Sequence, residues 1–230
     1  MSYERENIKQ MSGYSSGEQP EDGNTLKLNT NENPYPPSDL VTRAIQQFKP
    51  TELRRYPPPT AATFRQLTAK LHKLDVDNII ATRGGDELLR LVITTFVDPG
   101  KPIGVTDPTY SLYSVLAEIQ DCPLVEVGLL DDWGLPDNFA DTMNSSGVKL
   151  TLLVNPHAPS GALLPIQTIR ELANQLDSIL LLDEAYIDFV EEEFDTPSLV
   201  QDHHNLIILR TLSKGYSLAG LRFGYGIAAP

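Results

Sequence analysis

The chain has 230 residues, of which 40% are hydrophobic and 21% are charged, as is typical of a globular domain with a substantial core. Its 31 acidic residues outnumber its 18 basic ones and give a formal net charge of −13, so we expect neither nucleic acid nor anionic membrane as a partner. Cys122 is the single cysteine, and neither the N-terminus nor any later segment has the apolar run of a signal peptide or membrane span. We therefore expect a cytoplasmic protein without disulfides.

The N-terminal part of the chain differs in composition from the rest. Residues 1–25 are polar and rich in glycine and serine, which predicts an irregular, mobile arm, and one large domain is expected over residues 26–230. Prolines exclude helix at 33–37 and 56–59. Between them we expect a short helix over 38–48 with Ser38 as its cap.

From residue 60 onward, short apolar runs alternate with amphipathic segments. Helices are expected over 61–74, 86–96, 109–120 and 165–176, and strands over 78–81, 101–106, 123–127, 149–154, 178–183, 205–210 and 223–228. This alternation predicts a three-layer α/β/α domain whose mostly parallel sheet is covered on both faces. Ligands of such sheets bind beyond the carboxyl ends of the strands, where the polar motifs fall.

A pair of glycines, Gly84 and Gly85, stands between an expected strand and an expected helix. Paired glycines allow backbone N–H groups to approach an anion, and a helix N-terminus favours negative charge, so the segment suits a monophosphate. An ordinary strand-to-helix turn capped by Asp86 explains the same residues.

Two further motifs follow expected strands. Tyr110 opens a helix and could stack on a planar ring, although the motif taken alone favours an ordinary half-buried tyrosine. Asp183 ends an apolar run and needs a partner because burial of an unpaired charge is costly. A protonated pyridine nitrogen would serve, and Tyr186 could then reach a phenolic oxygen on the same ring. The alternative is an aspartate that only caps the following turn.

Lys214 lies among small residues, after Ser213 and eight positions before Arg222. This arrangement is typical of a lysine that forms a Schiff base with pyridoxal phosphate while the serine and the arginine hold the phosphate. The lysine must lose its proton to attack an aldehyde, and the charge of Arg222 disfavours the ammonium form. The arginine also offers a planar fork for a phosphate.

Together, the motifs resemble the fold-type I pyridoxal-phosphate-dependent aminotransferases, and among them the histidinol-phosphate aminotransferases. The resemblance runs in the family's order through 28–35, 55–57, 82–87, 107–110, 183–186 and 210–222. Each motif is weak alone, but the ordered set is specific. It implies reversible amino transfer between a small-molecule amino donor, histidinol phosphate, and a 2-oxo acid acceptor, 2-oxoglutarate, as a step of histidine biosynthesis.

The resemblance also implies roles at the cofactor ring. Lys214 would form the Schiff base and Asp183 would pair with the pyridine nitrogen. Tyr186 would bond the ring oxygen and Tyr110 would stack on the ring.

At the cofactor phosphate, the resemblance implies backbone N–H groups from Gly85 and Asp86 together with the side chains of Ser213 and Arg222. Tyr56 would reach the phosphate bound in a neighbouring subunit, which implies a two-fold homodimer.

The chain departs from the family pattern in two places. Residues 155–161 read Asn-Pro-His-Ala-Pro-Ser-Gly where the family has Asn-Pro-Asn-Asn-Pro-Thr-Gly, and Ala158 cannot make the family asparagine's bond to the ring oxygen. Either Tyr186 makes that contact alone or His157 takes part. The family also continues into a C-terminal small domain that supplies substrate-binding arginines, and the resemblance implies that this chain lacks it.

Two alternatives to the implied activity stay open. The same fold and motifs serve threonine-phosphate decarboxylases and other amino-acid aminotransferases. A different class is a non-catalytic chain that binds the cofactor, or supports a dimer, without turnover.

Overall fold

The computed structural model describes residues 2–11, 17–21 and 24–230. Within them, seven strands form a single sheet in the order β1-β7-β6-β5-β4-β2-β3. The strands are β1 (Ile79–Thr82), β2 (Ile103–Asp107), β3 (Leu124–Gly128), β4 (Leu150–Val154), β5 (Ile179–Asp183), β6 (Leu206–Thr211) and β7 (Gly224–Ala228). Five neighbours, β3, β2, β4, β5 and β6, run parallel, and β7 pairs antiparallel with both β6 and β1. The mostly parallel sheet is confirmed.

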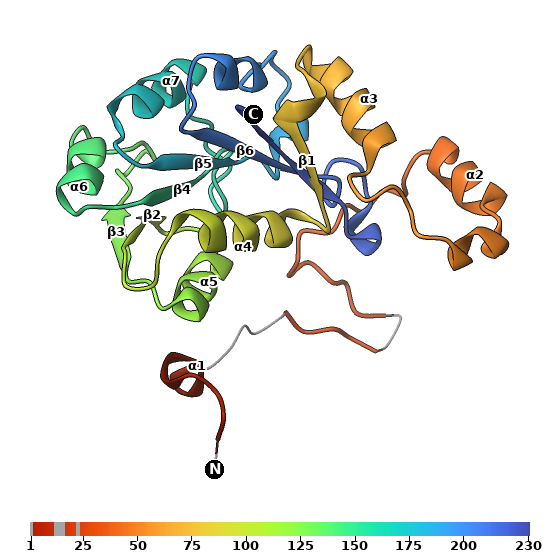
Figure 1. Cartoon of the computed structure of the whole chain (residues 1–230), viewed down its shortest axis with the longest axis horizontal. Helices are drawn as coiled ribbons and strands as arrows, with labels where there is room; N and C mark the ends of the chain where they lie inside the picture. The colour runs from red at the N-terminus through yellow and green to blue at the C-terminus, as the bar shows by residue number, and fades with distance from the viewer. Residues whose placement is uncertain (1, 12–16, 22–23) are drawn as a thin grey trace.

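Helices cover both faces of this sheet (Figure 1). The α-helices of the described residues are α1 (Glu6–Gln10), α2 (Asp39–Gln47), α3 (Ala62–His72), α4 (Gly85–Phe96), α5 (Leu112–Gln120), α6 (Phe139–Ser145) and α7 (Ile166–Gln175). Helices α4 and α5 pack on one face in a core that contains Ile93 and Tyr113, and α3, α6 and α7 pack on the other around Met143 and Ile169. The expected three-layer α/β/α architecture is therefore confirmed.

The structure differs from the sequence expectation in the N-terminal arm. Residues Glu6–Gln10 are helical rather than irregular, and they lie against α5, where Arg5 Nη2 donates to the Ile119 carbonyl at 2.6 Å and Asn7 Nδ2 donates to the Glu118 carbonyl at 2.7 Å. The last carbonyls of a helix lack intrahelical partners, so these side chains complete the end of α5. The parts of the expected arm at residues 12–16 and 22–23 lie outside the described residues.

Two smaller expectations are also corrected. Helix α6 was not expected, because its seven residues are too few for a clear helical period, although Phe139, Ala140 and Met143 are buried on one side. Ser38 precedes α2 as expected, but its side chain makes no capping hydrogen bond. No helix in the described part of the chain is long and apolar enough to cross a membrane.

The carboxyl edge of the sheet brings distant segments together. Strand β5 ends at Asp183, β6 is followed by Ser213 and Lys214, and β1 is followed by the glycine pair. At Gly224 an added Cβ would lie 2.8 Å from the carbonyl carbon of Gly84, so the two backbones are in direct contact there. Glycine is required at such an approach.

Candidate active site

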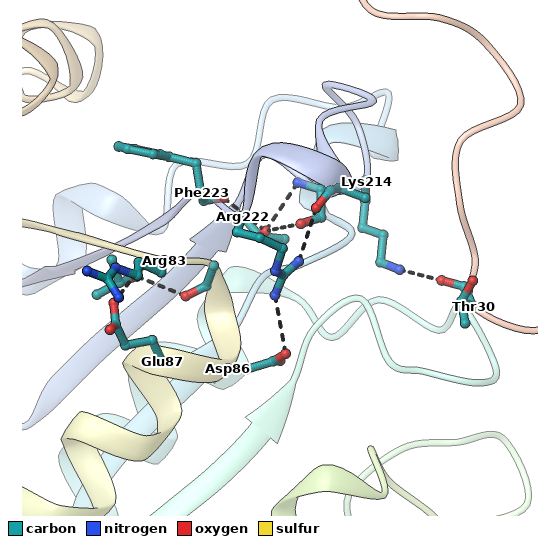
Figure 2. A network of polar contacts seen from close by, with 12 residues as sticks. Thr30, Arg83, Asp86, Glu87, Lys214, Arg222 and Phe223 are labelled. Carbon is teal, nitrogen blue, oxygen red and sulfur yellow. Dashed lines mark hydrogen bonds and ion pairs between the residues drawn. The ribbon is translucent and has the colours of Figure 1, made fainter. Parts of the chain in front are cut away.

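Lys214 is half-buried in the loop after β6. Its Nζ donates to the Thr30 carbonyl at 2.7 Å and to the Asn31 carbonyl at 3.3 Å, as Figure 2 shows for Thr30. Burial is the main cause of a lowered pKa of this amine, Arg222 acts in the same direction, and Glu32 and Asp86 act against them. A lowered pKa favours the free amine that a nucleophilic lysine requires.

A candidate cradle for an anion is formed by Gly84, Asp86 and Arg222 at the first turn of α4. Arg222 Nη2 lies 3.4 Å from Asp86 Oδ2, and the guanidinium faces the backbone at the start of the helix (Figure 2). Gly84 has φ +89° and ψ 172°, a region open essentially only to glycine. A Cβ there would lie 2.8 Å from Arg222 Nη2. The backbone conformation excludes a side chain from this turn, whereas Arg222 Nη2 is the end of a flexible side chain that could move away.

Ser213 is buried next to the cradle, 8% exposed. Its Oγ accepts a hydrogen bond from Thr211 Oγ1 at 3.0 Å, and its N–H donates to the same hydroxyl oxygen at 3.2 Å. This pair of contacts holds the serine at the end of β6.

Asp183 is 4% exposed and accepts two hydrogen bonds. The Tyr113 hydroxyl donates to Oδ2 at 2.9 Å, and the Ala185 N–H donates to Oδ1 at 3.1 Å. Burial raises the pKa of this carboxyl to about 6, against the pull of both donors. Among the described residues, no lysine, arginine or histidine forms an ion pair with it.

Tyr110 contacts Tyr113, and Tyr186 lies near Lys214. The Tyr110 ring makes an edge-to-face contact with the Tyr113 ring, with 5.6 Å between the centroids. The Tyr186 hydroxyl accepts a hydrogen bond from Asn31 Nδ2 at 2.9 Å, and Lys214 Nζ lies 5.8 Å from the centre of the Tyr186 ring. Tyr186 and Lys214 are thus neighbours in the structure, and their roles at a cofactor remain predictions.

His157 is buried at 5% exposure, and both of its ring nitrogens are engaged. Nδ1 lies 2.8 Å from Ser160 Oγ, Nε2 lies 2.9 Å from the Pro108 carbonyl, and the ring packs against Trp133. In this arrangement neither nitrogen is available to a ligand, and the neighbouring Ala158 carries no polar side-chain atom.

A family model described as "Aminotransferase class I and II" matches residues 23–230. The chain belongs to this aminotransferase family. It is 41% identical over 229 residues to histidinol-phosphate aminotransferase 1 of Trichormus variabilis, with 99% of this chain and 64% of the relative covered. It is 43% identical over 224 residues to histidinol-phosphate aminotransferase of Rhodopirellula baltica, with 97% and 61% covered. The chain thus spans less than two thirds of the length of these relatives.

Solved structures of longer proteins share the fold. Histidinol-phosphate aminotransferase from Sinorhizobium meliloti in complex with pyridoxal-5'-phosphate superposes with a TM-score of 0.81 at 27% identity, over 86% of this chain and 55% of that one. L-threonine-O-3-phosphate decarboxylase from Porphyromonas gingivalis superposes with a TM-score of 0.72 at 26% identity, over 85% and 58%.

The aminotransferase chain has the residue types that pyridoxal phosphate requires. The glycine turn under Arg222 and the N-terminus of the twelve-residue α4 suit a phosphate. The buried Asp183 suits a protonated ring nitrogen, and Lys214 suits the aldehyde carbon. Tyr56 is fully exposed and contributes nothing to this group of residues within a single chain.

Two contributions to the site were missed by sequence reasoning. The first is Tyr113, whose only sequence signal is its place one helical turn after Tyr110. The second is the segment around Thr30 and Asn31, which belongs to a matched motif but received no role of its own. Asn33 Nδ2 also donates to the Lys214 carbonyl at 3.0 Å, so this segment binds the lysine loop at several points.

Proposed function

We propose that the chain binds pyridoxal phosphate and serves reversible amino transfer between histidinol phosphate and 2-oxoglutarate, a step of histidine biosynthesis in the cytoplasm. The observation that carries the proposal is the convergence of Lys214, Asp183 and the Gly84–Arg222 cradle at one edge of the sheet. The similarity to curated histidinol-phosphate aminotransferases at 41–43% identity supports the choice of substrate.

The reacting end of the proposed site is Lys214. When bound, the cofactor supplies an aldehyde for the amine and a pyridinium ring that withdraws electrons from the substrate's Cα. The Lys214 amine, freed by the incoming substrate, carries the proton to and from Cα, and its lowered pKa favours this base role. Asp183 keeps the ring nitrogen protonated by offering a buried negative charge.

The remaining contacts orient the ring. Tyr110 stacks on one face of the ring, and Tyr186 donates its hydroxyl hydrogen to the ring oxygen. Because both nitrogens of His157 have partners within the fold, we assign the ring-oxygen contact to Tyr186 alone.

The phosphate is held at the start of α4 in this proposal. Backbone N–H groups of Gly85 and Asp86 point out of the helix end, and Ser213 and Arg222 add side-chain donors. A phosphate would compete with Asp86 for Arg222, whose present contact at 3.4 Å is long for an ion pair. Tyr56, fully exposed in the single chain, reaches the phosphate of a second copy in a homodimer.

The experiment is a titration of the purified chain with pyridoxal phosphate, followed by absorbance. We expect a saturable new visible band in the wild type and none with Lys214→Ala, because Lys214 is the lysine that the proposed site holds against the aldehyde. Lys149→Ala, which removes a lysine outside the site, should leave the band unchanged. A wild type without the band would overturn cofactor binding.

Substrate addition then separates the candidate activities. Glutamate and histidinol phosphate should each discharge the band by amino transfer. The similarity to threonine-phosphate decarboxylase makes carbon dioxide release from threonine phosphate the competing outcome. A band that no amine discharges would indicate a chain that binds the cofactor without turnover.

A further inference from the structure

Tyr113 is a fully buried tyrosine whose hydroxyl donates a hydrogen bond to the carboxylate of Asp183 in the proposed site. The side chain is 0% exposed, and its hydroxyl lies 2.9 Å from Asp183 Oδ2. The residue lies in α5, whereas Asp183 ends β5, so the bond joins a helix of the outer layer to the sheet. Burial, followed by the charge of Asp183, raises the pKa of the Tyr113 hydroxyl well above its usual value. The tyrosine therefore keeps its proton and is the donor.

We propose that Tyr113 is a positioning residue that orients Asp183 and keeps it ionised for the ring nitrogen of the cofactor. This inference rests on the proposed function, since it assigns Asp183 to that nitrogen. It adds a residue that acts through Asp183 and does not itself contact the cofactor.

The geometry of the carboxylate explains why the hydroxyl matters. Oδ1 is occupied by the Ala185 N–H and Oδ2 by the Tyr113 hydroxyl, so each oxygen has one donor that fixes its direction. A carboxylate has further lone pairs to offer, and a ring N–H can approach an oxygen that already has one donor. Without the hydroxyl, the carboxyl could rotate about its last bond and lose the alignment of a short charged hydrogen bond.

The same hydroxyl affects the charge of Asp183. A donor stabilises the ionised carboxylate more than the neutral acid, and Tyr113 is the strongest influence that opposes burial in setting the pKa of Asp183. The charge of Asp86 also acts on Asp183, and it raises that pKa. Loss of the hydroxyl would therefore move Asp183 toward the neutral form, which cannot compensate a ring cation.

Tyr113 also contacts Tyr110. Its ring meets Tyr110 edge to face at an interplanar angle of 81°, and Tyr110 is the residue proposed to stack on the cofactor ring. One buried side chain thus supports the stacking residue and the ring-nitrogen partner together.

The test is Tyr113→Phe in the full chain, which deletes the hydroxyl and keeps the ring. The matched control is Tyr225→Phe, which deletes another buried hydroxyl. That hydroxyl contacts His72 at 3.2 Å and hydrogen-bonds Arg210, and it makes no hydrogen bond to Asp183 among the described residues. Thermal unfolding and circular dichroism establish that both variants are folded. If Tyr113→Phe does not fold, the wild type labelled with 3-fluorotyrosine replaces it: its more acidic hydroxyl donates more strongly and should lower the pKa of Asp183, and an unchanged pKa would overturn the inference.

The first readout needs no cofactor. The carboxyl carbon of Asp183 is followed by NMR as a function of pH in the wild type and in both variants. We expect the pKa of Asp183 to rise in Tyr113→Phe and to stay unchanged in Tyr225→Phe. An unchanged pKa in Tyr113→Phe would overturn the inference while leaving the proposed function intact.

The second readout compares pyridoxal phosphate with its 1-deaza analogue, which lacks the ring nitrogen. Tyr113→Phe should weaken binding of pyridoxal phosphate about tenfold or more, the size expected for a hydrogen bond to a charged group, and should change binding of the analogue less than about twofold. An equal loss for both would mean that Tyr113 acts only through packing and would overturn the inference. A wild type that binds neither compound would overturn the proposed function, and this inference with it.

Discussion

Asp183 and Glu184 are neighbours in the chain and both are buried, at 4% and 1% exposure, but their partners differ. Glu184 has a cation within the fold, since Arg210 Nε lies 2.8 Å from its Oε2, and the Thr196 hydroxyl donates to its Oε1. Asp183 has two uncharged donors and, among the described residues, no ion-pair partner. Because adjacent strand residues point to opposite faces, the two side chains face different layers.

The difference separates a carboxylate that is paired with a cation inside the fold from one that we propose pairs with a ligand. The Glu184–Arg210 pair joins the segment that carries Asp183 and Tyr186 to the strand that leads into Lys214, so it holds two parts of the site in register. Burial acts to lower the pKa of Arg210, but Glu184 and Tyr225 together outweigh it and the pKa of the guanidinium is raised. Asp183 has no such cation, and burial raises its pKa to about 6; in the proposed function, its charge serves the ring nitrogen of the cofactor.

The largest change in the free energy of unfolding is expected from breaking the Glu184–Arg210 ion pair. Glu184→Ala leaves the Arg210 charge buried without a partner and should lower the free energy of unfolding by about 3–5 kcal/mol, as measured by urea denaturation. Glu6→Ala is the control, because the pair of Glu6 with Lys9 is exposed and should be worth less than about 1 kcal/mol. Equal losses in the two variants would show that the buried ion pair contributes no more to stability than the exposed one.

A substitution of Asp183 should change the free energy of unfolding in the opposite direction. Asp183→Asn should stabilise the cofactor-free chain by about 1–3 kcal/mol near neutral pH, because the buried charge is removed, and should weaken binding of pyridoxal phosphate. The folded-state pKa of about 6 lies above the usual 3.8. The contribution of Asp183 to stability is therefore fully present below a pH of 3.8, the usual pKa, and is lost as the pH rises through the folded-state pKa of about 6. Unfolding measured as a function of pH should show a gain in Asp183→Asn that vanishes on acidification.

A hydroxyl on the Glu184 side gives a smaller effect. Thr196→Val removes the donor to Glu184 Oε1 from a fully buried site and should cost about 1–2 kcal/mol of unfolding free energy. Thr151→Val is the matched control, because the Thr151 hydroxyl is equally buried but lies 3.0 Å from the uncharged Ser178 hydroxyl. The loss at Thr196 should be about twice the loss at Thr151. A larger loss in the control would argue that the charge on Glu184 does not matter.

The smallest effect concerns His72, which lies 3.2 Å from the Tyr225 hydroxyl on the Arg210 side. Burial, followed by the charge of Arg210, lowers the pKa of His72 from 6.5 to about 4. The contribution of His72 to stability is therefore present above a pH of 6.5 and is lost as the pH falls through the folded-state pKa of about 4. This pH dependence is opposite to that of Asp183. Because the ring is partly solvated, we expect only about 1 kcal/mol over this window. His72→Gln should remove that acid-dependent loss in pH-resolved unfolding, and the exposed His204→Gln serves as control.

Most of the sheet and its helices could be predicted from the sequence. The apolar run before Asp183 predicts β5, and the glycine pair at Gly84 and Gly85 marks the start of α4, because both signals are local. The antiparallel pairing of β1 with β7 could not be read in this way, since strand neighbours depend on how the whole chain closes its core. Helix α6 was missed for lack of length, and α1 because its contacts with α5 outweigh a weak local preference for helix.

Within the site, the sequence by itself determined which residue types stand at the ends of strands: Asp183, Lys214 and the glycines beneath Arg222. These follow from patterns a few residues long. Only the tertiary structure decided which residues form hydrogen bonds with these side chains. The hydroxyl of Tyr113 reaches Asp183 across 70 positions, and the carbonyl of Thr30 meets Lys214 across 184. Such contacts arise from strand order and layer packing, and no short-range periodicity encodes them.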